Sequence, residues 1–296
     1  MLKKKHRMNS KRTSFLLWTL TLFIAISTMI YQRATGPTYP KKIETQIAGK
    51  TYKLKLLRSN EIGSPCHIDL PIEDINVNAT IYYKLYKSNN DWTVEEMTRE
   101  IAHKKAFFGE GDEISVLRST LPEQAAAGKV AYYIELYNSK EKVVIQKETP
   151  VVVRFKGFVP RYILTPHILF MIFSLFFGLR AGIEAIANRE NTLRFASITL
   201  IVLGIGGLIL GPIVQLYAFG DLWTGWPYGG DWTDNKTIVA WFFWLITVIV
   251  LRKKPHNKVW PILAVIVLFA MYMIPHSMGG SELNAETGKI ETGIQK

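Results

Sequence analysis

Cysteine is almost absent from this sequence of 296 residues. The single cysteine, Cys66, excludes an intramolecular disulfide, and no Cys-x-x-Cys-His run is present for covalent haem attachment. Cys66 also lies too far from the first apolar run to carry a lipoprotein anchor. We therefore interpret it as a structural residue in a loop-like stretch.

Motifs for nucleophilic, phosphate-binding and metalloprotease chemistry are also missing. The sequence contains no G-x-S-x-G, no P-loop and no H-E-x-x-H run. We predict no catalytic residue, and a protein that is not an enzyme is the favoured interpretation. Ionisable residues are scarce within the apolar runs, whereas ion-coupled transporters normally need them at mid-membrane depth. A small-solute permease is therefore the weakest functional alternative.

Long apolar runs are present, at the N-terminus and from residue 162 onward. Runs of about 18 or more apolar residues indicate membrane helices, because about 20 residues cross the hydrocarbon layer. The sequence predicts five spans, at residues 14–31, 162–183, 195–216, 237–251 and 259–275. The remaining parts are a basic N-terminus, a polar middle, a four-helix domain and a polar tail, at residues 1–13, 32–160, 161–276 and 277–296.

The net charge of +12 is explained largely by two short segments. The N-terminal segment carries Lys3, Lys4, Lys5, Arg7, Lys11 and Arg12, and the segment before the last span carries Arg252, Lys253, Lys254 and Lys258. Lys and Arg accumulate in cytoplasmic segments of membrane proteins. This distribution predicts a multi-pass inner-membrane protein in contact with the lipid bilayer. The N-terminus would be cytoplasmic and the C-terminus periplasmic. No nucleic-acid reading motif accompanies the charge, so no nucleic-acid partner is expected.

The first apolar run follows basic residues, so a cleaved signal peptide competes with a membrane anchor. The residues after it, Tyr31-Gln32-Arg33-Ala34, lack a small-x-small cleavage pattern, and the run is long for a signal. We predict an uncleaved signal anchor.

The polar middle, 32–160, shows period-two alternation of apolar residues. It occurs at 52–56, 81–85, 130–136, 143–145 and 151–155. Such alternation is typical of strands with one face on a core and the other in water. Several short strands separated by turns predict an extracytoplasmic β-sandwich. The more charged stretch 92–106 fits either a strand pair or a short helix.

Within the four-helix domain, three local features stand out. Gly207 and Gly211 form a small-xxx-small pair, which fits helix packing within the chain or a dimer face. Arg180 and Glu184 can pair on one helix face while Arg180 reaches the interface. Either Thr233 or Asp234 is placed to cap the helix that follows.

The topology brings several chemically capable residues to the outer side. His167 and His276 each follow a proline near an outer helix end. The loop 217–236 carries three tryptophans, Trp223, Trp226 and Trp232, and three aspartates, Asp221, Asp231 and Asp234. Two histidines could ligate haem b axially, or imidazoles and carboxylates could hold a transition metal. The competing interpretation gives the histidines backbone hydrogen bonds near the prolines and the tryptophans an anchoring role in the headgroup layer.

Four stretches carry a resemblance that spans most of the chain. They are TGPTYP at 35–40, LPEQ and AGK within 121–129, WTGWP and TDNK within 223–236, and PHS at 275–277. Together they resemble a family of bacterial inner-membrane proteins of the kind seen in Bacteroidota. The resemblance brings no activity, ligand or catalytic residue. Separately, the strand pair at 130–145 resembles the closing hairpin of an immunoglobulin-like or fibronectin III-like module, a likeness shared by modules of many functions.

The sequence therefore favours a partner-binding or complex-scaffolding protein that acts through its extracytoplasmic β-domain, with a protein partner at the outer face. The first alternative is a haem- or metal-binding redox protein that uses His167 and His276. The permease is the second alternative.

Overall fold

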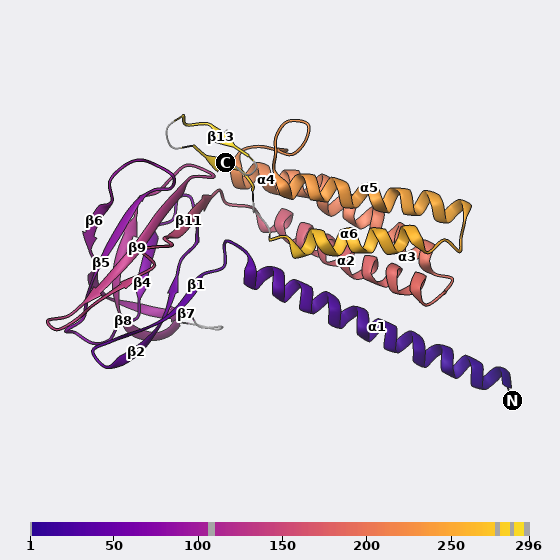
Figure 1. Cartoon of the computed structure of the whole chain (residues 1–296), viewed down its shortest axis with the longest axis horizontal. Helices are drawn as coiled ribbons and strands as arrows, with labels where there is room; N and C mark the ends of the chain where they lie inside the picture. The colour runs from indigo at the N-terminus through magenta and orange to yellow at the C-terminus, as the bar shows by residue number, and fades with distance from the viewer. Residues whose placement is uncertain (1, 106–109, 276–278, 285–286, 293–296) are drawn as a thin grey trace. The chain divides into compact units, whose positions relative to one another are not determined.

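The computed structural model describes residues 2–105, 110–275, 279–284 and 287–292. The chain divides into two compact units, one helical and one mostly β (Figure 1). The β unit comprises Thr38–Phe158 together with Ser281–Glu291, so it takes up a segment from far along the chain.

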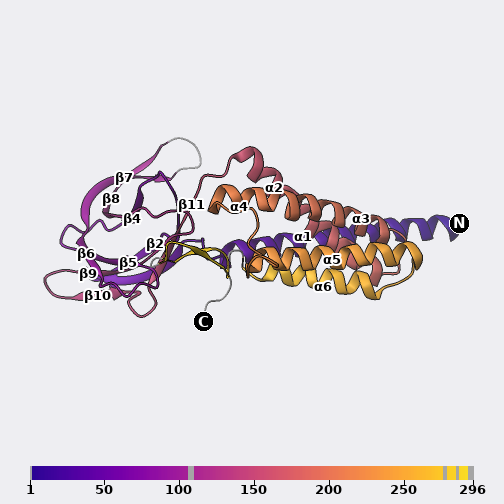
Figure 2. The same ribbon diagram turned by 90° about the horizontal axis from the view of Figure 1, so that it is seen from above.

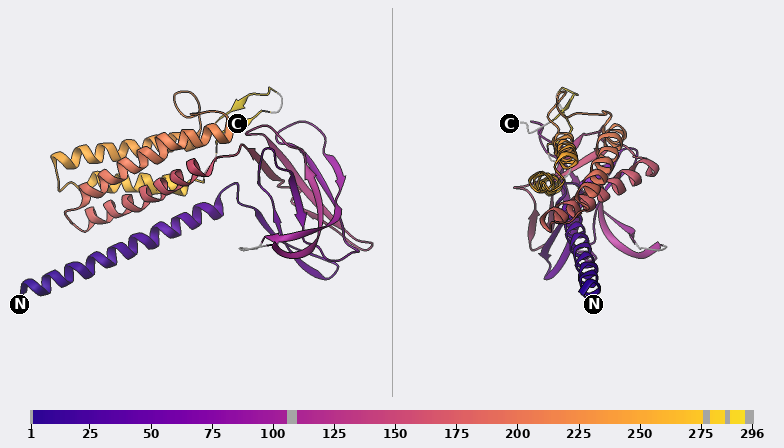
Figure 3. Two further views of the ribbon diagram at one scale, coloured as in Figure 1. Left: turned by 180° about the vertical axis from the view of Figure 1, so that it is seen from behind. Right: turned by 90° about the vertical axis from the view of Figure 1, so that its right-hand side faces the viewer.

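The helical unit contains one long N-terminal helix and a group of helices that run alongside one another in two views (Figures 2 and 3). Its elements are α1 (Leu2–Thr35), α2 (Arg161–Ile186), α3 (Thr192–Leu203), η1 (Gly204–Leu210), α4 (Gly211–Phe219), α5 (Trp232–Lys253) and α6 (Val259–Met273). Four segments are long and apolar enough to cross a membrane: Arg12–Thr35, Arg161–Ile186, Thr192–Phe219 and Trp232–Lys253. The fifth predicted span corresponds to α6, which is apolar but only 15 residues long.

The third apolar segment changes its helical hydrogen bonding near its middle. Between α3 and α4, the seven residues of η1 form a π-helix with the sequence GIGGLIL. Two glycines in and just after η1 differ in the room around them: a Cβ on Gly207 would lie 2.5 Å from Thr237 Cγ2 of α5. A Cβ on Gly211 would meet no atom closer than 3.6 Å. Gly207 therefore packs tightly within the chain, whereas Gly211 does not.

The C-terminal end of α2 carries the predicted ion pair. Arg180 bonds to Glu184, as expected from their spacing, and Arg189 lies 3.4 Å from the same carboxylate. The expectation that Arg180 reaches outward is wrong, because its side chain is buried. The guanidinium lies over the Trp18 ring, 4.6 Å from the ring centroid, which holds it between helices.

The β unit contains several sheets (Figure 1). The largest has strand order β3-β11-β9-β5-β6, with β10 also paired to β9; a second has the order β4-β8-β7. The strands of these sheets are β3 (Ser59–Glu61), β4 (Cys66–Leu70), β5 (Asn78–Leu85), β6 (Thr93–Glu96), β7 (Thr98–Lys105), β8 (Glu110–Leu121), β9 (Lys129–Tyr137), β10 (Lys142–Ile145) and β11 (Val151–Lys156). Two hairpins complete the unit: β1 (Lys41–Ile47) with β2 (Lys50–Leu56), and β12 (Glu282–Leu283) with β13 (Ile290–Glu291).

One hydrophobic core joins the sheets. The predicted alternation is confirmed along β9, where Val130, Tyr132, Ile134 and Leu136 face this core. Cys66 also lies in the core, at the start of β4, so it sits in a strand and not in a loop. The stretch that fitted either strands or a helix forms β6 and β7.

The C-terminal segment belongs to the β unit, which the sequence did not indicate. Glu282 pairs with Lys129 of β9 at 2.6 Å and with Lys87 at 3.1 Å. The Leu283 N–H donates to the Ala127 carbonyl. Part of the predicted free tail is therefore bound to the domain that precedes α2.

Candidate functional site

The loop between α4 and α5 is built around two aspartates. Asp231 caps α5, because its Oδ1 accepts from the Thr233 N–H at 2.7 Å. The predicted cap, Thr233 or Asp234, is therefore wrong by two or three residues. Asp231 also receives a bond at Oδ2 from the Thr224 hydroxyl at 3.2 Å, which fixes the far side of the loop.

Asp234 lies beside Asp231 and is 6% exposed. Its Oδ2 accepts from the backbone N–H groups of Thr224 and Gly225 at 2.8 and 2.9 Å. With its amide nitrogen toward the carboxylate, Gln215 donates to Asp234 Oδ1 at 2.9 Å. A Cβ on Gly225 would lie 2.5 Å from the Asp234 Cβ, so only glycine fits here. These oxygens are engaged in holding the loop closed.

The loop tryptophans do not form one stacked group. Trp223 donates from Nε1 to the Trp226 carbonyl at 3.1 Å, which shapes the turn. Trp226 and Tyr228 project outward, with exposed fractions of 70% and 84%. Trp232 lies against Gly279, whose added Cβ would be 3.1 Å from the indole Cδ1. The predicted aromatic loop therefore exposes the rings of Trp226 and Tyr228, while Trp223 bonds within the loop.

The predicted histidine pair is only half described. His276 lies outside the described residues. His167 places Nδ1 2.9 Å from the Gly206 carbonyl in η1. Among the residues that the structure describes, no three His, Cys, Asp or Glu side chains gather at a metal-binding spacing. Of the predicted metal candidates, Asp231 and Asp234 lie together; His167 bonds to η1, and Asp221 is half-exposed.

A group of aromatic side chains lies on the face of the six-stranded sheet that points away from the core. Tyr82 of β5 stacks on Tyr133 of β9, with ring centroids 4.5 Å apart, and Trp92 meets Tyr133 edge-on at 4.9 Å. We call these three residues the sheet-face cluster. Lys84 lies over the Trp92 ring, 5.1 Å from its centroid. Aromatic rings with adjacent cations at a sheet surface are typical of binding faces.

The charges beside the sheet-face cluster are fixed by direct bonds. The Tyr82 hydroxyl donates to Glu135 at 2.8 Å, and Lys142 pairs with the same carboxylate at 2.5 Å. The bond to Glu135 and partial burial raise the pKa of Tyr82 to about 12. Burial works to raise the pKa of Glu135, but bonds from Lys142 and Tyr82 lower it below its ordinary value. The face therefore keeps a neutral phenol and a charged carboxylate across the physiological range.

Strand β6 lies at the edge of this face. All four of its residues are exposed, and Val94, which lies opposite Tyr82, is 57% exposed. Within the described part of the chain, β6 pairs with β5 and with no other strand. An edge strand of this kind presents unpaired backbone groups to solvent.

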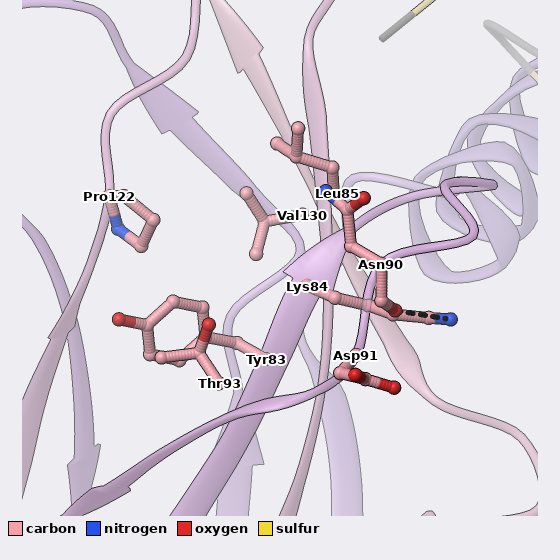
Figure 4. Close-up of a pocket in the computed structure, with 8 residues that line it drawn as sticks. All are labelled: Tyr83, Lys84, Leu85, Asn90, Asp91, Thr93, Pro122 and Val130. Carbon is pink, nitrogen blue, oxygen red and sulfur yellow. Dashed lines mark hydrogen bonds between the residues drawn. The ribbon is translucent and has the colours of Figure 1, made fainter. Parts of the chain in front are cut away.

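A small pocket opens at the start of β6 (Figure 4). Its volume is about 160 Å³, and Leu85, Val130, Pro122 and Tyr83 form its apolar walls. Asn90, Asp91 and Thr93 supply polar groups near its rim, and Lys84 bonds to the Asn90 carbonyl. Burial, followed by the charge of Glu95, raises the pKa of Tyr83. A cavity of this size suits one side chain, since an engineered cavity of about 150 Å³ binds benzene.

Sequence reasoning missed the sheet-face cluster, and for the edge strand it left a strand pair and a short helix open as alternatives. The outward residues of β5 and β9 were readable from the alternation, because Tyr82 and Tyr133 occupy the positions between core residues. The contribution of Trp92 was not readable, because it lies outside any alternating run.

Comparisons with protein-family models, with curated proteins and with solved structures find no match to this chain. Its function is therefore inferred from its own geometry.

Proposed function

We propose that this chain is a membrane-anchored binding protein whose periplasmic β-domain holds a protein partner. The domain is an immunoglobulin-like sandwich. The chain crosses a bacterial inner membrane five times, with a signal anchor and a cytoplasmic N-terminus. The resemblance to the inner-membrane family is part of this proposal.

Chain connectivity supports five crossings despite the short α6. The β unit contains residues that precede α2 in the sequence and residues that follow α6. Lys129 belongs to the first group, and its ion-pair partner Glu282 belongs to the second. An even number of crossings is needed to return the chain to the same side. Three long segments, α2, α3–α4 and α5, require a fourth crossing, and α6 supplies it. At about 22 Å, α6 is shorter than the hydrocarbon layer, which local bilayer thinning accommodates.

Strand connectivity supports the immunoglobulin-like assignment. The order β4-β8-β7 corresponds to strands B, E and D, and β11-β9-β5-β6 corresponds to G, F, C and C′ of a variable-type domain. The inter-sheet disulfide of antibody domains is missing, since Cys66 is the single cysteine. A shared hydrophobic core takes its place.

The observation that carries partner binding is the sheet-face cluster, in which Tyr82 and Trp92 are partly exposed over the buried Tyr133, next to the open β6 edge. Hot spots of protein interfaces are rich in Trp and Tyr that are held rigidly before binding. Tyr82, Trp92 and Tyr133 are fixed by stacking, by Glu135 and by Lys84. Among the described residues, strands β4, β8 and β7 of the other sheet carry no Phe, Tyr or Trp side chain, and there Arg118 pairs with Asp69 and Glu100.

The test is photocrosslinking in intact cells. A photoreactive amino acid replaces Val94 beside the cluster, or Ile75 as the control, which is 77% exposed elsewhere in the same unit. We expect an adduct of one discrete mass from position 94 and none from position 75. Equal adducts from both positions, or none from position 94, would contradict the proposal.

One observation supports the haem- or metal-binding alternative. Because a carbonyl accepts only, the bond to Gly206 places the proton of His167 on Nδ1 and leaves Nε2 free to ligate, as in many metal-bound histidines. This alternative expects a Soret band or stoichiometric metal that disappears in His167→Ala. A colourless, metal-free preparation from cells supplied with haem and metals would overturn it. The permease stays a prediction that rests on the π-helix in the third apolar segment.

A further inference from the structure

The free edge of β6 offers backbone donors at known positions. The Met97 N–H donates to the Ala79 carbonyl at 2.8 Å, so it points toward β5. Backbone groups alternate in direction along a strand. The N–H of Glu95 therefore also points toward β5, while those of Val94 and Glu96 point to the open side. Two donors are thus available to another strand.

This edge is locally acidic in a chain of net charge +12. Asp91, Glu95 and Glu96 lie on or just before β6, and residues 88–98 contain no Lys or Arg. Lys84 is the nearby cation, but the Trp92 ring and the carbonyls of Ser88 and Asn90 engage it. Glu95 accepts from the Ser119 hydroxyl at 2.9 Å, which holds one carboxylate at the edge.

Acidic residues on an edge strand have two physical consequences. They repel an identical edge, so two copies of this chain do not pair through β6. They also attract a strand that carries positive charge, because side chains directly opposite in a sheet interact most strongly. The pocket of about 160 Å³ borders the start of β6, where Thr93 lines it together with Tyr83 and Leu85 of β5 (Figure 4).

We propose that β6 takes up an extended, basic segment of a partner polypeptide as an added strand, with one side chain in the pocket lined by Tyr83, Leu85 and Val130. Main-chain bonds supply affinity in such a mode, and the pocket supplies specificity. This inference rests on the proposed partner-binding function and names its mode and the chemistry of the partner.

The probe is a fluorescent ten-residue peptide of alternating Thr and Lys, measured by anisotropy against the full chain in detergent micelles. Two comparison peptides are used: one with Glu in place of Lys, and one with Lys retained but alternate amides N-methylated. We expect the Lys peptide to bind at least tenfold more tightly than either. The net positive charge of the chain favours the Glu peptide in general, so a Lys preference reports a local site.

Paired variants locate the site. Val94→Pro removes an outward N–H without breaking the β5 ladder, since proline is tolerated on the open side of an edge strand. We expect at least a tenfold loss in Val94→Pro and less than a twofold change in Val94→Thr. Glu95→Gln combined with Glu96→Gln should weaken the Lys peptide by about tenfold. Glu44→Gln, on exposed β1, is the charge control and should have no effect.

The outcomes separate this inference from the function on which it rests. If Val94→Pro fails to fold, the N-methylated peptide and the Glu95→Gln/Glu96→Gln variant still test strand addition. Equal binding of the Lys and Glu peptides, or binding unchanged in both edge variants, overturns strand addition and leaves the edge charges as protection against aggregation. Crosslinking of one partner at position 94 that persists in the Glu95/Glu96 variant would retain partner binding while rejecting this mode.

Discussion

Two acidic groups in this chain have similar composition and opposite surroundings. Asp231 and Asp234 are buried, and their oxygens accept bonds from Thr224, Gly225 and Thr233. Along β6, the carboxylates are exposed and the backbone edge beside them pairs with no strand of the described chain. A buried acid with its bonds complete stabilises the fold, whereas exposed acids at an open edge can meet a partner.

The comparison changes how the loop is understood. The sequence predicts the loop aspartates and tryptophans as candidate site residues, but in the structure Asp231 and Asp234 form the hydrogen bonds that close the loop. The sequence does not predict the sheet-face cluster, yet its stacked aromatic rings lie beside an open strand edge. Four experiments test this contrast, beginning with the largest expected effect.

Replacing the buried loop carboxylate should be the most damaging change. Asp234→Ala leaves two backbone N–H groups without their acceptor, so we expect a loss of about 2–4 kcal/mol. Thermal unfolding in micelles measures the loss, and hydrogen exchange should speed up at Thr224 and Gly225. Asp221→Ala, half-exposed in the same loop, should change stability by less than about 0.5 kcal/mol. Equal losses of stability in the two variants would contradict the structural role assigned to Asp234.

Substitutions at Gly207 and Gly211 of the third apolar segment should also differ in their effect on stability. Gly207→Ala places a methyl against Thr237 and should cost about 1–3 kcal/mol through overpacking. Gly211→Ala has room and should be within about 0.5 kcal/mol of the original chain. Melting temperatures in micelles provide the readout. A dimer face would reverse the order, and Gly211→Ala would then change the oligomeric state.

The C-terminal ion pair should give a pH-dependent effect of intermediate size. Burial acts to raise the pKa of Glu282, but bonds from Lys129 and Lys87 lower it overall. Its contribution is therefore present above the unfolded pKa of about 4.3 and is lost as pH falls through the lower folded value. We expect Glu282→Gln to cost about 1–2 kcal/mol at pH 7, since it leaves Lys129 without its charge partner.

The measurement is denaturant unfolding of the β unit between pH 7 and pH 3. The difference between the original chain and Glu282→Gln should shrink as the pH falls below about 4.3. A difference that stays constant over this range would show that the C-terminal segment is held by its backbone bonds alone.

The smallest stability change is expected at the β6 edge. Glu95→Gln with Glu96→Gln should alter unfolding by less than about 0.5 kcal/mol, because exposed charges contribute little. Circular dichroism melts check this. A loss comparable to that of Asp234→Ala would mean that the edge acids are structural.

The sequence predicted the parts of the fold in which one face is buried. Strands β2, β5, β9, β10 and β11 alternate because each packs on the core. Strand β6 is exposed on both faces, so its residues follow no apolar period. The β12–β13 hairpin has two-residue strands, and the bond from Glu282 to Lys129 of β9 joins residues 153 positions apart. Neither leaves a local signal.

The candidate sites were predictable to different degrees. The loop aspartates were predicted as candidate metal ligands together with the histidines; in the structure Asp231 and Asp234 both lie near the Thr224 hydroxyl. The cap at Asp231 was missed because three capping candidates, Asp231, Thr233 and Asp234, lie within four residues just before the apolar run. The bond from His167 to Gly206 depends on η1, which a glycine-rich run does not specify.

The most direct test of strand addition at the β6 edge compares the two acidic groups in one experiment. The crosslinking yield at position 94, normalised to folded protein, is measured in Asp234→Asn and in the Glu95/Glu96 double variant. The account predicts an unchanged yield in Asp234→Asn and a yield reduced about tenfold in the double variant. An unchanged yield in the double variant, or an equal fall in both, would contradict it.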